Sequence, residues 1–159
     1  MKETLNTGLT EVKREKTAKG LIKLLANNSV LYLKTHNFHW NVIGPMFQPL
    51  HSLFEEQYID LWNAGDTIAE RVRALGFFVP ASYADFAKLS EIKEAIGNKR
   101  IEAKVMLTQL VDDNQIIVRL ARGLLPEIEK TEDQVTVDLL SDRMQVHEKN
   151  AWMLRSFLE

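Results

Sequence analysis

The sequence contains no cysteine, and only four prolines and seven glycines interrupt its 159 residues. Without cysteine, the chain can form no disulfide bond, thiolate metal site or cysteine nucleophile. It also lacks any apolar run near the roughly 20 residues needed to cross a bilayer. Residues 1–10 lack the apolar core of a signal peptide. We therefore expect a cytosolic protein without a membrane partner.

An excess of charge of one sign is also missing. The 20 basic and 22 acidic residues give a formal net charge of −2, which argues against attraction of nucleic acid over the whole surface but allows a local basic patch. The length is that of one domain able to bury a sizeable core. We predict a single domain over residues 1–159, with residues 1–16 as a flexible N-terminal tail.

What the sequence does have is helical periodicity. Apolar residues recur every three, four or seven positions, and no strand-like alternation competes. Gly44-Pro45 separates two long helices, because glycine favours the position after a helix and proline the first turn of the next. The order predicts an all-α fold, a ferritin-like four-helix bundle with a long connection between helices two and three. The predicted helices span 17–42, 47–75, 90–123 and 131–158, with a short extra helix within 77–86.

Ligand-type side chains gather around the first predicted turn. His39 ends the first helix and His51 begins the second, so a helical hairpin can bring them together. Glu55 follows His51 by one turn, and Asp66 and Glu70 lie one turn apart further on. At about 100° per residue, the members on the second helix share one stripe. Such acids are also common on solvated surfaces, but imidazoles with carboxylates suit iron or another first-row divalent ion.

The spacing along the second helix decides how such a site can be built. His51 and Asp66 lie about 22 Å apart on a helix that rises about 1.5 Å per residue, whereas metal ligands lie about 2 Å from the ion. One chain therefore cannot bring both pairs to one metal. A two-fold dimer with antiparallel second helices can, and it creates two equivalent sites. A di-iron site within one chain uses Glu-x-x-His motifs on two helices. The last helix lacks this motif, because Met144 stands three residues before His147.

These segments resemble the Dps family, the DNA-binding proteins from starved cells, also called mini-ferritins. The resemblance rests on residues 39–47, 50–56 and 66–76, with the spacing His-x11-His-x3-acid-x10-Asp-x3-Glu, and it continues through residues 147–153 in the last helix. One departure is Glu55, because many members have aspartate at that position. Glutamate keeps the charge and adds a methylene, which predicts retained ligation with an altered reach.

The resemblance implies a ferroxidase that oxidises Fe(II), preferably with H2O2 and otherwise with O2. Ferric mineral would be stored in a homododecamer built from two-fold dimers, protecting the bacterial cytosol or nucleoid from oxidative damage. Zinc is a candidate competing ion. Carried over by position, the ligands of the di-iron centre are His39, His51 and Glu55 of one subunit, with Asp66 and Glu70 of its partner.

Acidic residues also cluster at the start of the last predicted helix. The resemblance places this region at three-fold pores through which Fe(II) enters the shell. Compensation of the helix dipole is an alternative explanation for the first of these acids. The candidate pore residues are Asp133, Asp138 and Asp142.

The N-terminal segment suggests an alternative function. Residues 1–20 carry five basic and three acidic side chains, and twelve weakly basic tails on one shell would multiply an attraction to DNA. The alternative is thus mainly a DNA-binding, nucleoid-compacting protein with a secondary or degenerate metal site. The candidate DNA contacts are Lys2, Lys13, Arg14, Lys16 and Lys19.

Overall fold

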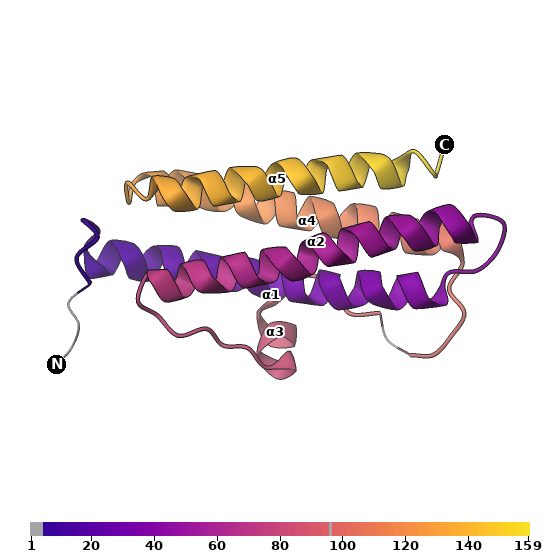
Figure 1. Ribbon diagram of the computed structural model, residues 1–159, viewed down its shortest axis with the longest axis horizontal. Coiled ribbons are helices and arrows are strands. Elements are labelled where there is room, and N and C mark those ends of the chain that lie inside the picture. The colour runs from indigo at the N-terminus through magenta and orange to yellow at the C-terminus, as the bar shows by residue number, and fades with distance from the viewer. Residues whose placement is uncertain (1–4, 96) are drawn as a thin grey trace.

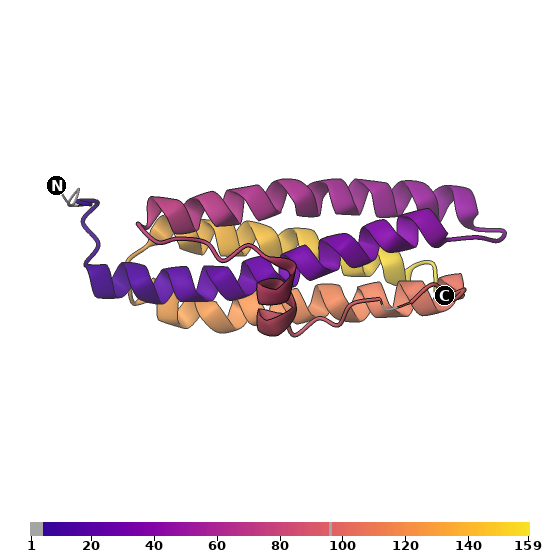
Figure 2. The same ribbon diagram turned by 90° about the horizontal axis from the view of Figure 1, so that it is seen from below.

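The computed structural model describes residues 5–95 and 97–159, and within them every regular element is a helix. Helix α1 packs most extensively on α2, and α4 on α5, so the two pairs form a long bundle (Figure 1). Helix α3 lies beside α1 on the outside of the bundle (Figure 2). The predicted all-α four-helix bundle with a short extra helix is confirmed. The helices are α1 (Glu11–Asn41), α2 (Phe47–Ala74), α3 (Tyr83–Leu89), α4 (Ala103–Glu129) and α5 (Gln134–Arg155).

The start of α1 and the end of α4 differ from the prediction. Helix α1 begins six residues before Thr17, because the side chain of Thr10 accepts a hydrogen bond from the Lys13 N–H and caps the helix. Residues 11–16 of the predicted tail are therefore helical. Helix α4 continues through Pro126 to Glu129. The proline lies in the last turn, where it removes only one hydrogen bond of the helix.

The start of the third long helix was predicted at Ser90, but residues 90–102 are irregular and α4 begins at Ala103. The reason is Asn27, a fully buried residue of α1. Its Oδ1 accepts hydrogen bonds from the backbone N–H groups of Glu91 (2.9 Å) and Ile92 (3.2 Å) and from the Ser90 hydroxyl (3.2 Å). The amide of Asn27 therefore fixes the segment that follows α3 against α1.

Replacing Asn27 with leucine is expected to loosen this segment. Two backbone donors lose an acceptor in a buried place, which costs about 1–3 kcal/mol of unfolding free energy. Urea denaturation and amide hydrogen exchange at Glu91 and Ile92 measure the effect, and Asn98→Leu, in an exposed part of the same connection, is the control. Unchanged exchange at both amides would contradict this role of Asn27.

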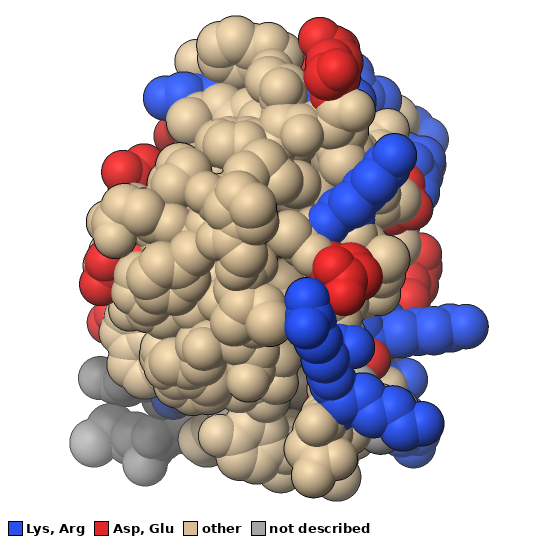
Figure 3. All heavy atoms as spheres, turned by 90° about the vertical axis from the view of Figure 1, so that its right-hand side faces the viewer, with Lys and Arg blue, Asp and Glu red and all other residues tan. Residues whose placement is uncertain are grey.

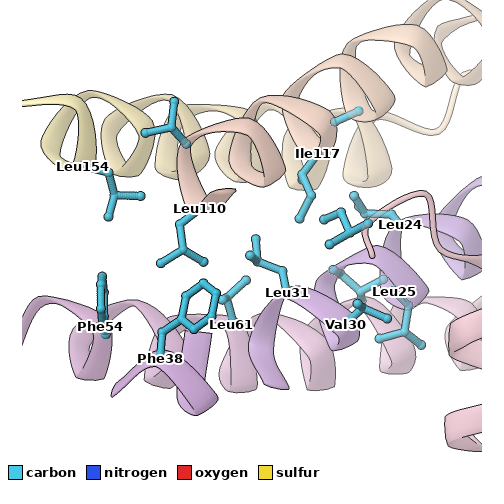
Figure 4. Packing of buried hydrophobic residues seen from close by; sticks show 14 of the residues in the cluster. Leu24, Leu25, Val30, Leu31, Phe38, Phe54, Leu61, Leu110, Ile117 and Leu154 are labelled. Carbon is cyan, nitrogen blue, oxygen red and sulfur yellow. The ribbon is translucent and has the colours of Figure 1, made fainter. Parts of the chain in front are cut away.

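The core is formed by apolar side chains that all four long helices contribute. In Figure 4, Leu110 of α4 and Leu154 of α5 point toward the aromatic rings of α1 and α2. No helix in the described ranges is long and apolar enough to span a membrane. The buried core residues include Leu24, Leu31, Phe38, Phe54, Leu61, Leu110, Ile117 and Leu154.

Polar contacts also cross this core. Lys34 of α1 pairs with Asp113 of α4 at 2.7 Å, with both side chains less than one-tenth exposed. His147 of α5 donates from Nδ1 to Asn114 Oδ1 of α4 at 2.7 Å and accepts at Nε2 from Arg143, 3.2 Å away. Burial, and then the charge of Arg143, lower the pKa of His147 to about 3. The imidazole is therefore a neutral part of the core.

Candidate metal centre

His39 and His51 meet across the turn between α1 and α2, as the predicted hairpin requires. Their rings stack with centroids 3.7 Å apart and an interplanar angle of 18°. His39 Nδ1 lies 2.8 Å from the carbonyl oxygen of His51, and His51 Nδ1 lies 2.9 Å from that of His39. Each imidazole therefore donates to the backbone of the other residue's helix.

This reciprocal bonding determines what the two rings can bind. A carbonyl oxygen only accepts, so both Nδ1 atoms carry a proton, and in the neutral form of each ring the lone pair is on Nε2. A hydrogen bond from the second ring nitrogen orients a metal-binding histidine in this way. His39 is 7% exposed and His51 is partly exposed, so the pair lies at the edge of the bundle rather than in its core. Two oriented nitrogen donors are thus available.

Aromatic rings surround this pair. Phe47 stacks on His51 with centroids 5.0 Å apart, and Tyr58 meets His39 edge-on at 5.2 Å and 74°. Figure 3 views the end of the bundle that carries the α1–α2 turn, and a broad part of this end bears no charged side chain. The histidine pair is therefore held among aromatic side chains on a largely uncharged end of the molecule.

Glu55 lies one turn after His51 on α2 and is exposed. The Tyr58 hydroxyl donates a hydrogen bond to Glu55 Oε1 at 3.5 Å. Desolvation, and then the charge and hydrogen bond of Glu55, raise the pKa of Tyr58 above its usual range. Tyr58 was not singled out from the sequence, although its position three residues after Glu55 is a signal that the two side chains are neighbours.

Asp66 and Glu70 are exposed residues of α2, on the stripe that also carries His51. Asp66 lines a groove of about 990 Å³ bordered by α1, α2 and the segment of α3. Trp62 and Tyr83 also line it, with 65% and 82% of their surfaces exposed. Exposed aromatic residues gathered in a groove are a feature of surfaces that bind another molecule.

The structure does not bring the five predicted ligands together within one chain. In residues 5–95 and 97–159, no three His, Asp or Glu side chains lie close enough to hold one metal ion. The histidine pair with Glu55, at the turn between α1 and α2, is therefore a separate group from Asp66 and Glu70, which lie further along α2.

The candidate pore residues have different surroundings. Asp133 is buried, caps the N-terminus of α5 and accepts from Arg71 at 2.7 Å and from the Thr136 hydroxyl at 2.7 Å. Its carboxylate is committed inside the subunit, in line with the alternative of dipole compensation. Asp138 and Asp142 are exposed on α5. Only these two can present a carboxylate to a passing cation.

Four of the candidate DNA contacts are occupied within the chain, and Lys2 lies outside the described residues. Lys13 pairs with Glu132, Lys16 with Glu127, and Lys19 with Glu15 at 2.7 Å. Arg14 donates to the carbonyl oxygen of Leu75 at 2.7 Å. Phosphate would have to compete with these internal partners, so the start of α1 offers little free positive charge.

Comparisons with known proteins agree with this architecture. A model of the ferritin-like domain matches residues 18–159. The DNA protection during starvation protein 2 of Bacillus anthracis is 40% identical over 139 residues, which cover 87% of this chain and 93% of that protein.

Solved structures give the same result. The Dps protein of Vibrio cholerae O1, described as a member of a broad superfamily of ferritin-like diiron-carboxylate proteins, superposes with a TM-score of 0.90 at 35% identity and covers 97% of this chain and 96% of its own. The Dps protein of Bacillus brevis has a TM-score of 0.87 at 37% identity, with 93% and 98% covered. The chain therefore belongs to the Dps family of ferritin-like proteins.

Proposed function

We propose that this protein is a ferroxidase that binds and oxidises Fe(II) at centres shared by two copies of the chain and stores the ferric product in a dodecameric shell. His39, His51 and Glu55 of one copy face Asp66 and Glu70 of the other. The reciprocal hydrogen bonds of His39 and His51 carry this proposal, because they leave two Nε2 lone pairs oriented beside a carboxylate-bearing helix.

The symmetry of the residue positions on α2 supports a shared centre. His51 and Glu70 are equally distant from the midpoint between residues 60 and 61, and so are Glu55 and Asp66. Two antiparallel α2 helices that cross at this midpoint place each histidine end against the acidic end of its partner.

The exposed apolar residues of α2 obey the same symmetry. Ile59 and Trp62 are 47% and 65% exposed, and they also lie equally far from that midpoint on the same helical stripe. In the antiparallel pair, Ile59 of one copy packs beside Trp62 of the other. Burial of these side chains supplies an apolar contact next to the axis.

The donor set suits a pair of Fe(II) ions as substrates. Three carboxylates offset most of the charge of two divalent ions, and the two imidazoles supply neutral nitrogen donors. With peroxide, two Fe(II) each lose one electron, and H2O2 takes both electrons and two protons to give two waters. Because two Fe(II) ions deliver both electrons to one H2O2, the one-electron reduction of peroxide to hydroxyl radical is avoided.

Anaerobic loading with Fe(II), followed by H2O2 or O2, tests the proposal. Ferric formation is followed by near-ultraviolet absorbance, and light scattering is expected to show a particle of about 220 kDa for twelve chains of 18.3 kDa. No oxidation with either oxidant would reject the ferroxidase.

Entry of iron is expected to depend on Asp138. Asp138→Asn removes one exposed carboxylate per chain at the start of α5 and should slow Fe(II) uptake severalfold, because local negative potential raises the encounter rate of cations. Stopped-flow absorbance at low ionic strength measures the rate, and chromatography checks assembly. Asp112→Asn, an exposed carboxylate of α4, is the control for net charge. Equal rates for both variants would argue against a pore at Asp138.

A further inference from the structure

Glu55 has one more rotatable bond than an aspartate would have at this position. Each sp³–sp³ torsion offers three staggered wells, so the longer side chain is oriented less tightly by its own backbone. An exposed glutamate on a helix also keeps its rotamer freedom unless a neighbour restrains it. Without such a restraint, binding of the metal ion must itself fix the extra torsion of the side chain, which costs conformational entropy.

Tyr58 is placed to supply the restraint. Its hydroxyl donates to Glu55 Oε1 at 3.5 Å, and its ring meets the ring of His39 edge-on, with centroids 5.2 Å apart. One side chain therefore contacts two proposed ligands that come from different helices. The second oxygen of Glu55 remains available for a metal ion, because Tyr58 bonds only Oε1.

Tyr58 is itself held by residues of α1. His36 stacks on its ring with centroids 3.9 Å apart and an interplanar angle of 16°, and Trp40 covers the imidazole at 4.0 Å. The Tyr32 hydroxyl lies 3.3 Å from His36 Nδ1 and limits rotation of the imidazole. The three rings come from α1 and α2, with Tyr58 stacked on His36 and Trp40 tilted by 34° against it, so they fix the phenol relative to both helices.

We propose that Tyr58 is a positioning residue that orients the Glu55 carboxylate for iron, and that stacking on His36 holds the phenol in place. This inference rests on the proposed function, in which Glu55 is a ligand. It explains how the long, exposed side chain of Glu55 can present its carboxylate in one orientation.

Tyr58→Phe tests the hydrogen bond, because phenylalanine retains the ring and the stack. Loss of one such bond predicts a KM for Fe(II) about three- to tenfold higher, with a smaller change in kcat. Anaerobic titration of the assembled protein with Co(II), which is not oxidised, should show the same weakening by visible absorbance. Thr108→Val, which removes an exposed hydroxyl of α4 away from the proposed ligands, is the control. Unchanged KM and Co(II) affinity in Tyr58→Phe would overturn the proposal.

A double-variant cycle separates positioning from a general structural effect. In a Glu55→Asp background, the carboxylate ends one methylene further from the phenol, so adding Tyr58→Phe should change Co(II) affinity less than twofold. An equal loss in both backgrounds would show that Tyr58 does not act through Glu55, and the inference would fail.

The role of the stack has its own pair of variants. His36→Ala removes the ring beneath Tyr58 and should weaken Co(II) binding as Tyr58→Phe does, whereas His36→Phe keeps a flat ring and should restore most of the affinity. Wild-type affinity in His36→Ala would reject the role of the stack. Failure of the proposed function is recognised separately, because wild-type protein would then bind Co(II) without oxidising Fe(II).

Discussion

Mixing two inactive variants is expected to restore about one quarter of the wild-type ferroxidase activity. The first carries His39→Ala and His51→Ala, and the second carries Asp66→Ala and Glu70→Ala. Each homogeneous assembly lacks one half of every centre and should be inactive. Random reassembly of equal amounts puts half of all two-fold pairs into the mixed form, and each mixed pair has one fully intact centre and one with both halves lost.

Coexpression with two different affinity tags isolates shells that contain both chains. The initial rate of Fe(II) oxidation is then measured per chain and compared with wild type and with each parent. The histidine variant leaves α2 otherwise intact. Its assembly into shells is therefore the control that the chain still folds. A rate no higher than that of the parents would contradict a centre shared between chains, because two lesions in one intrachain site never complement each other.

The sequence predicts the bundle well because the signals for long helices are local. Apolar periodicity and the Gly44-Pro45 turn define α1 and α2 without any knowledge of packing. The same two helices carry His39 and His51, so the hairpin prediction already placed the two rings side by side. What the pattern could not supply is the exchange of hydrogen bonds between them, which depends on the register of two packed helices.

The wrong start of the third long helix shows where local signals fail. Ser90 with Glu91 has the composition of a helix N-terminus. In the fold the Ser90 hydroxyl bonds to Asn27, and Glu91 pairs with Lys23. Both partners lie on α1, more than 60 positions earlier in the chain. Tertiary contacts therefore took over the polar groups that a helix start would have used.

In the candidate site, too, local spacing predicts some features and contacts between helices determine the others. The spacing on α2 indicated which carboxylates share a stripe, whereas the stack that holds Tyr58 requires His36 from α1. The family resemblance groups Asp133 with the pore residues, but Arg71 of α2 binds it inside the subunit. Residues whose partners lie on another helix are the ones that a single sequence cannot assign.

The stability of the bundle is expected to fall in acid because of His147. The pKa of this residue is lowered from 6.5 to about 3 by burial and by Arg143, so the folded chain keeps it neutral where the unfolded chain binds a proton. Stability is then complete above about pH 6.5 and is lost as the pH falls toward about 3. Between about pH 7.5 and pH 4.5, this one group should cost about 3 kcal/mol of unfolding free energy per chain.

His147→Gln isolates that contribution, because glutamine can bond to Asn114 but does not titrate. The difference in unfolding free energy between wild type and variant, measured with urea at one protein concentration, should shift by about 3 kcal/mol in favour of the variant between these two pH values. Acidic side chains contribute equally to both proteins and cancel in the difference. The charge of Arg143 is offset by Asp60 of α2, 2.7 Å away, so this ion pair persists in the variant. A difference that is constant with pH would show that His147 accepts a proton within the folded bundle, and the burial that excludes it would then be incomplete.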